Sequence, residues 1–212
     1  MNYDIFTDYY KNNTWQGKES VSGQGSDHEQ VIFLIPELEI LFKDLNIKSI
    51  LDIPCGDFNW MKNVNLKEIN YHGADVVEEL IKSNNTEYKA DNINFSVINI
   101  VTDLLPKVDL IIVRDCLVHL PTNEVFKALK NIKNSQSKYL LTTHNTWIHR
   151  ENNVEINLGE WRRINLQQPP YNFKYPERIL IEGNTVSPDR DKTMSLWNIQ
   201  DIPDQYGDNN GI

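Results

Sequence analysis

The feature that most constrains the fold of this chain is a series of apolar, strand-like segments, several of them followed by helical ones. The strands are predicted at residues 48–54, 70–77, 94–100, 108–115 and 138–144, and clear helices at 78–85 and 121–134. Strands that are apolar on both faces and alternate with helices are typical of a parallel sheet covered on both sides. Segments 177–184 and 193–202 predict an edge hairpin of two further strands. We therefore expect an α/β fold with a mostly parallel seven-stranded sheet, helices on both faces and an antiparallel edge strand.

Three segments lie outside this alternation. Residues 1–28 are polar, aromatic and rich in Gly and Ser, which predicts an arm or lid instead of a strand or a long helix. Apolar residues at steps of three and four predict a helix over 29–45 that Pro36 kinks or splits. Residues 145–176 have little periodicity, and an irregular segment of this length is usually functional, so we expect a long loop on the substrate side.

Composition narrows the class of protein. The 212 residues are 40% hydrophobic and 24% charged, which suits one globular domain over 1–212. No apolar run approaches the ~20 residues of a membrane helix, and the N-terminus lacks the features of a signal peptide, so a cytoplasmic protein without a membrane span is expected. The net charge of −9 argues against nucleic acid as a partner, because binding to phosphates needs clustered Lys and Arg.

The two cysteines and the possible metal ligands carry little information. Cys55 and Cys116 cannot form paired CxxC motifs, and their apolar surroundings predict buried free thiols. Oxygen and nitrogen ligands for a divalent ion could come from a larger set, although no spacing within it indicates a site and we assign no metal. That set is Asp115, His119, His144, Asp189 and Asp191.

The turn after the first strand indicates the kind of ligand. Ligands of an open parallel sheet bind beyond the carboxyl ends of its strands. Gly56 lies in that turn, and Asp75 follows it by 19 residues at the end of the second strand, where a carboxylate can accept hydrogen bonds from both hydroxyls of a ribose. The chain lacks GxGxxG and GxxxxGK[ST], and Asp57 would repel a phosphate. The pattern favours an adenosine-containing cofactor that carries a positive charge and an amino group.

These segments resemble the motifs of the class I S-adenosylmethionine-dependent methyltransferases. "ILDIPCGDFNW" (50–60) resembles the first motif, with Asp57 at the second glycine position, and "YHGADVV" (71–77) resembles the second. "FSVINIVTD" (95–103) is similar to the segment that places an amide or acidic residue against adenine, and "DLIIVRDCLVHL" (109–120) to the fourth motif.

The resemblance implies a Rossmann-like methyltransferase fold with S-adenosylmethionine as cofactor and S-adenosylhomocysteine as product. The cofactor-binding residues that it implies are Asp52, Pro54, Gly56, Asp57, Asp75, Val76, Asn99, Ile100 and Arg114. The match is closer still to a bacterial branch of the family, whose members are associated with modification of sugars or polysaccharides. Its shared segments correspond here to 22–26, 54–61, 114–120 and 140–143.

Catalytic and substrate-binding candidates follow from this interpretation. Asp115, His119 and His144 lie after the fourth and fifth strands, and a histidine with a pKa near 6.5 suits removal of a proton from an alcohol. The long loop offers aromatic faces for a sugar and cations for phosphate or carboxylate. Its candidates are Trp147, Arg162, Arg163 and Tyr171, with Trp161 and Phe173 as further aromatics.

The predicted function is an S-adenosylmethionine-dependent O-methyltransferase that acts on a sugar hydroxyl, in a sugar nucleotide or in a precursor of a capsule or cell-surface polysaccharide. The alternatives are a methyltransferase on another small molecule or on a protein, and an NAD-dependent oxidoreductase on a similar sheet. A binding protein without activity is a further alternative. The sequence leaves the oligomeric state, the methyl acceptor and the general base open.

Overall fold

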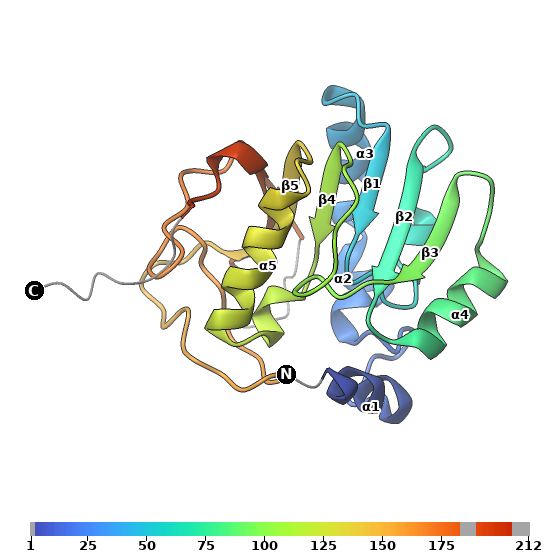
Figure 1. Cartoon of the computed structure of the whole chain (residues 1–212), viewed down its shortest axis with the longest axis horizontal. Helices are drawn as coiled ribbons and strands as arrows, with labels where there is room; N and C mark the ends of the chain where they lie inside the picture. Colours follow the sequence, from blue (N-terminus) through green and yellow to red (C-terminus); the bar gives the residue numbers. More distant parts are fainter. Residues whose placement is uncertain (1–2, 183–189, 205–212) are drawn as a thin grey trace, which may run out of the picture.

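The computed structural model describes residues 3–182 and 190–204 and contains one seven-stranded sheet (Figure 1). The strand order is β3-β2-β1-β4-β5-β7-β6. β1 to β5 run parallel, and β7 is antiparallel to both β5 and β6. The predicted fold class is confirmed, including the hairpin at the edge. The strands are β1 (Ser49–Asp52), β2 (Asn70–Asp75), β3 (Ile93–Val97), β4 (Leu110–Val113), β5 (Tyr139–Asn145), β6 (Arg178–Ile181) and β7 (Lys192–Asn198).

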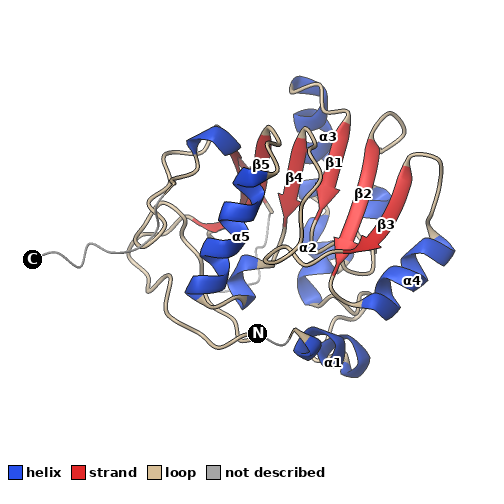
Figure 2. Cartoon of the chain, in the orientation of Figure 1, coloured by secondary structure: helices blue, strands red, loops and turns tan. Residues whose placement is uncertain are grey.

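Helices cover the two faces of the sheet (Figure 2). Successive residues of a strand point to opposite faces, and the two halves of the core follow this alternation. Ile50 packs with α3 and α4, whereas Leu51 packs with α5. The helices are α1 (Asp4–Asn12), α2 (His28–Val31), α3 (Leu34–Asp44), α4 (Glu78–Glu87) and α5 (Thr122–Asn134). None of the helices described is long and apolar enough to cross a membrane.

The N-terminal part of the chain adds a short helix to the predicted arm, and it contains the predicted break in the helix that follows. The segment 1–28 contains the nine-residue helix α1, which lies beyond the carboxyl ends of the parallel strands (Figure 1). The helix predicted over 29–45 is split into α2 and α3, as expected, but the break lies at residues 32–33 and not at Pro36. Pro36 stands in the first turn of α3, where its missing N–H would have no partner within the helix.

The second half of the long loop after β5 contributes side chains to the core. Residues 146–177 contain no helix or strand. Four of their apolar side chains are buried with α5 and Trp197 on one face of the sheet. This loop therefore takes the place of a covering helix, and only part of it borders the functional site. The four side chains are Ile164, Leu166, Tyr171 and Phe173.

Candidate active site

A cavity of about 740 Å³ lies at the carboxyl ends of the parallel strands, where the ligand of an open parallel sheet was expected. We name its two ends by the strands that form them. The β1–β2 end comprises 53–56, 75–77 and 98–101, and the β4–β5 end comprises Asp115, His119, Thr143, Asn145 and Lys192. Nine of the predicted site residues line this cavity. They are Pro54, Gly56, Asp75, Val76, Asn99, Ile100, Arg114, Asp115 and His119.

Gly56 and Asp75 form the core of the β1–β2 end. Gly56 has a φ of 54°, a conformation that favours glycine, and its N–H donates to Oδ2 of Asp75 at 3.2 Å. Oδ1 of Asp75 accepts a hydrogen bond from the N–H of Val77 at 3.1 Å. Each carboxylate oxygen accepts through two lone pairs, so Asp75 can still accept hydrogen bonds from a ligand. Burial raises the pKa of Asp75 to about 6, against the lowering effect of these hydrogen bonds.

Two predicted cofactor residues do not line the cavity, and direct contact with a ligand is unsupported for both. Asp52 is buried, and its Oδ2 accepts a hydrogen bond from the hydroxyl of Tyr71 at 2.6 Å. Burial raises the pKa of Asp52 to about 7, although Tyr71 and Arg114 lower it. Asp57 points to the N-terminal arm instead.

The carboxylate of Asp57 anchors that arm. It accepts hydrogen bonds from the hydroxyl of Ser20 at 2.9 Å, the N–H of Val21 at 3.0 Å and the hydroxyl of Ser22 at 3.2 Å. The N–H of Asp57 in turn donates to the hydroxyl of Ser22 at 2.9 Å. Residues 21–26 line the cavity as a result. The arm therefore forms one wall of the cavity.

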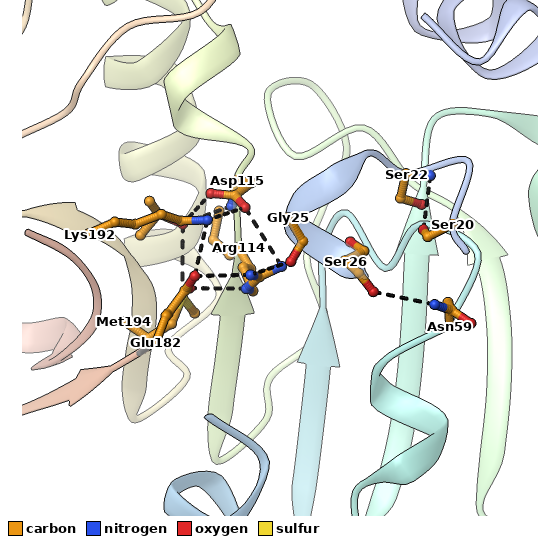
Figure 3. A network of polar contacts seen from close by, with 12 residues as sticks. Ser20, Ser22, Gly25, Ser26, Asn59, Arg114, Asp115, Glu182, Lys192 and Met194 are labelled. Carbon is orange, nitrogen blue, oxygen red and sulfur yellow. Dashed lines mark hydrogen bonds and ion pairs between the residues drawn. The ribbon is translucent and has the colours of Figure 1, made fainter. Parts of the chain in front are cut away.

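A cluster of four charged side chains joins the arm to the β4–β5 end (Figure 3). Arg114 donates to both oxygens of Glu182 at 3.1 and 3.0 Å and to the carbonyl of Gly25 at 2.7 Å. Lys192 lies 2.6 Å from Asp115 and 3.1 Å from Glu182. The positive charges of Arg114 and Lys192 balance the negative charges of Asp115 and Glu182. The two hydrogen bonds to Glu182 fix the orientation of the Arg114 guanidinium. The sequence alone does not pair these residues, because Glu182 and Lys192 belong to the edge hairpin.

Asp115 is held too firmly to be a good proton acceptor. Its φ is 51°, an uncommon value for a residue with a side chain, and its N–H donates to the hydroxyl of Thr143 at 2.8 Å. Burial raises its pKa, but Lys192 and Arg114 outweigh this and hold the pKa of Asp115 well below its usual range. The geometry therefore favours Asp115 as an anchor for Lys192, not as a general base.

His119 has the properties of a base. Its Nδ1 lies 3.0 Å from the carbonyl oxygen of Glu160. A carbonyl can only accept, so Nδ1 carries the hydrogen and Nε2 of the neutral ring is the acceptor. Burial lowers the pKa of His119, although the Glu160 hydrogen bond and Asp115 raise it, and the neutral form is favoured near pH 7. The ring lies 5.5 Å from that of Trp15, centroid to centroid.

The other catalytic candidate, His144, lies outside the cavity. Its Nδ1 accepts a hydrogen bond from the N–H of Leu166 at 3.2 Å, and its ring packs edge-on against Trp197. Burial lowers its pKa to about 4. Because side chains alternate along β5, Thr143 and Asn145 reach the cavity while His144 points to the opposite side. A catalytic role for His144 is therefore unsupported.

The four substrate-binding candidates also lie outside the cavity lining. Arg162 is buried and donates to the hydroxyl of Tyr171 at 2.9 Å, so these two residues hold the loop together in the core. Trp147 is half-exposed and stacks with Arg150. Arg163 lies 5.4 Å from the ring centroid of Trp161. The aromatic residues that do line the cavity are Tyr3, Phe6, Tyr10, Trp15, Trp60 and Trp161.

No cluster suited to a metal ion is found among residues 3–182 and 190–204. Asp189, one of the ligands considered above, lies outside those ranges. The cysteines are both free and both line the cavity, although Cys116 is only partly buried.

No family model matches the sequence, and no curated protein matches it. Solved structures do match the fold. A SAM-dependent methyltransferase from Leishmania major has 14% identity and a TM-score of 0.65, with 92% of this chain and 82% of that one covered. The 1,6-didemethyltoxoflavin-N1-methyltransferase of Burkholderia thailandensis, with bound 1,6-didemethyltoxoflavin and S-adenosylhomocysteine, has 11% identity and a TM-score of 0.61, with 92% and 85% covered. The fold is thus the Rossmann-like fold of SAM-dependent methyltransferases.

Proposed function

We propose that this chain is an S-adenosylmethionine-dependent O-methyltransferase and that the cavity holds the methyl donor. The observation that carries this proposal is the β1–β2 end, where Gly56 and Asp75 meet at the carboxyl edge of a methyltransferase fold. Asp75 offers lone pairs for the two hydroxyls of a ribose. A volume of about 740 Å³ falls within the range of small-molecule sites.

The other residues of the cavity fit the remaining parts of the donor. Val76, Asn99 and Ile100 would hold the adenine, and Arg114 with residues 22–26 would hold the methionine part. When bound, S-adenosylmethionine supplies a methyl group activated by a cationic sulfur and leaves as S-adenosylhomocysteine. The arm, which forms one wall of the cavity, would limit the access of water and so the loss of the methyl group to solvent.

The acceptor that we propose is a sugar hydroxyl, in a sugar nucleotide or in a polysaccharide precursor. Two features of the β4–β5 end support it. His119 presents Nε2 as a proton acceptor. Trp15 and Trp161 offer apolar faces to a ring, beside the hydrogen-bonding side chains of Thr143 and Asn145. The two free cysteines fit a reducing compartment, so we place the reaction in the cytoplasm.

A second acceptor class is a planar heterocycle. Five aromatic residues of the arm and the long loop line the cavity, and the Burkholderia thailandensis enzyme binds a toxoflavin precursor. A protein acceptor is less favoured, because the arm covers the cavity. These aromatic residues are Tyr3, Phe6, Tyr10, Trp15 and Trp161.

The experiment that tests the proposal is release of S-adenosylhomocysteine from S-adenosylmethionine. The acceptors are hexoses linked to uridine, guanosine and thymidine diphosphates, with planar nitrogen heterocycles as a second group. Release that depends on a sugar nucleotide, with a methyl ether found by mass spectrometry, is the expected result. If S-adenosylhomocysteine is released only with the heterocycles, the acceptor is a planar heterocycle and not a sugar. Hydride transfer from NADH with no methyl transfer would overturn the proposal altogether.

A further inference from the structure

Asn145, the last residue of β5, presents an unused hydrogen-bond donor to the cavity. The residue is 2% exposed and lines the β4–β5 end. Its Oδ1 accepts a hydrogen bond from the N–H of Ile164 at 3.1 Å, and its own N–H donates to the carbonyl of Ile164 at 2.8 Å. Because a backbone N–H can only donate, the atom that faces Ile164 must be the oxygen. The Nδ2 amide group therefore points away from Ile164, and it has no hydrogen-bond partner within residues 3–182 and 190–204.

This donor lies at the same end of the cavity as His119. Asn145 is the register partner of Lys192 on β7, and Lys192 binds Asp115. The segment 159–164 connects the two sides. The carbonyl of its Glu160 accepts a hydrogen bond from Nδ1 of His119 at 3.0 Å, and its Ile164 holds Asn145. One short segment thus fixes both the acceptor Nε2 of His119 and the donor Nδ2 of Asn145.

We infer that Asn145 binds the nucleophilic oxygen of the methyl acceptor and makes the site selective for oxygen over nitrogen. This inference rests on the proposed function. A hydroxyl oxygen has one hydrogen and two lone pairs. The hydrogen goes to Nε2 of His119, one lone pair accepts a hydrogen bond from Nδ2 of Asn145, and the other lone pair attacks.

The transfer balances in this arrangement. The attacking lone pair forms a carbon–oxygen bond to the methyl group, and the carbon–sulfur bond breaks with its electron pair kept by sulfur, which becomes a neutral thioether. The hydroxyl proton converts His119 into an imidazolium, which later returns the proton to solvent. A neutral amine has a single lone pair, and it must form the new bond. A donor aimed at that lone pair competes with the reaction, so Asn145 disfavours nitrogen acceptors.

The test compares two substitutions of the same chemistry, Asn145→Asp and Asn153→Asp. Each keeps the oxygen that accepts a backbone N–H, which comes from Ile164 in one case and from Asn165 in the other. Nδ2 of Asn153 already donates to the carbonyls of Asn165 and Pro169, and Asn153 does not line the cavity. Only Asn145→Asp therefore removes a donor that is available to a ligand.

The measurements are kcat/KM with the sugar nucleotides and with their amino-sugar counterparts, binding of S-adenosylmethionine by calorimetry, and the thermal midpoint. Asn145→Asp is expected to lower kcat/KM for hydroxyl acceptors roughly 10- to 100-fold, the effect of one lost hydrogen bond, with unchanged binding of S-adenosylmethionine. Asn153→Asp is expected to lower the thermal midpoint and leave kcat/KM for the hydroxyl acceptor as it was.

Three results would overturn the inference. The first is an equal kcat/KM in Asn145→Asp and the wild type. The second is a wild type that methylates the amino nitrogen of the amino sugars in preference to a hydroxyl, and the third is a wild type that methylates no hydroxyl of the panel. If the wild type binds S-adenosylmethionine in these cases, only the role of Asn145 or the acceptor class is wrong. If it does not bind S-adenosylmethionine, the proposed function itself fails.

Discussion

The two ends of the cavity differ in how far apart their residues lie along the chain. The β1–β2 end comes from short consecutive turns after neighbouring parallel strands, and its key contact joins Gly56 and Asp75. The β4–β5 end gathers residues from β4, β5, β7, the arm and the long loop. In the function proposed above, the methyl donor binds at the first end and the acceptor at the second. The comparison therefore predicts separate effects of substitutions at the two ends.

The largest effect is expected at the β4–β5 end. His119→Ala should lower kcat roughly 10²- to 10⁴-fold through loss of the base, with unchanged affinity for S-adenosylmethionine. The wild-type kcat/KM should rise with pH, with the midpoint of the rise below the ordinary histidine value of about 6.5, since burial lowers the pKa of His119 and the base acts unprotonated. His72→Ala serves as the control, because His72 pairs with Ser96 away from the cavity. An equal loss of kcat in His119→Ala and His72→Ala would show that His119 is not the general base.

At the β1–β2 end we expect an effect on binding of the cofactor and not on kcat. Asp75→Ala should weaken binding of S-adenosylmethionine roughly 10- to 100-fold, because the ribose loses its acceptor, with kcat retained at saturating donor. Asp75→Asn is the control for disruption of the turn, because its side-chain carbonyl oxygen can still accept a hydrogen bond from a backbone N–H of the turn. Calorimetry measures both variants. If both variants bind S-adenosylmethionine with the affinity of the wild type, Asp75 does not contact the cofactor.

A smaller effect is expected where the arm joins the β1–β2 end. Asp57→Ala removes the anchor of Ser20, Val21 and Ser22. The dissociation constant for S-adenosylmethionine should rise about 10-fold, and limited proteolysis should cut within the arm more rapidly. Weaker binding with no change in proteolysis would mean that Asp57 contacts the cofactor directly.

The smallest effect on catalysis is expected in the long loop. Tyr171→Phe leaves a buried donor of Arg162 without its acceptor, which should cost about 1–3 kcal/mol of stability and lower the thermal midpoint by a few degrees. The KM for the acceptor should not change. Tyr175→Phe is the control, since Tyr175 is 88% exposed. A raised KM with an unchanged midpoint would restore Tyr171 as a substrate residue.

The positions that the structure gives to the predicted residues follow the same division. Nine predicted residues line the cavity because strand ends and the turns after them are local features. Asp52 and Asp57 occur in the same motif, yet one side chain binds Tyr71 and the other binds the arm. Their direction depends on contacts between segments that are distant in the sequence.

Part of the β4–β5 end was within reach of the sequence. Alternation along the fifth strand places Thr143 and Asn145 on one side and His144 on the other, although it does not say which side faces the cavity. Burial of Arg162 and pairing of Lys192 with Asp115 could not be found in this way. Both depend on how the long loop and the edge hairpin fold back on the sheet.

The central claim is that one cavity on this fold holds S-adenosylmethionine. Titration calorimetry of the wild-type chain with S-adenosylmethionine, S-adenosylhomocysteine and NAD tests it most directly. We expect one site per chain for each of the first two ligands, lost or strongly weakened in Asp75→Ala, and no heat from NAD. Binding of NAD alone, or binding of S-adenosylmethionine that Asp75→Ala leaves unchanged, would contradict the account.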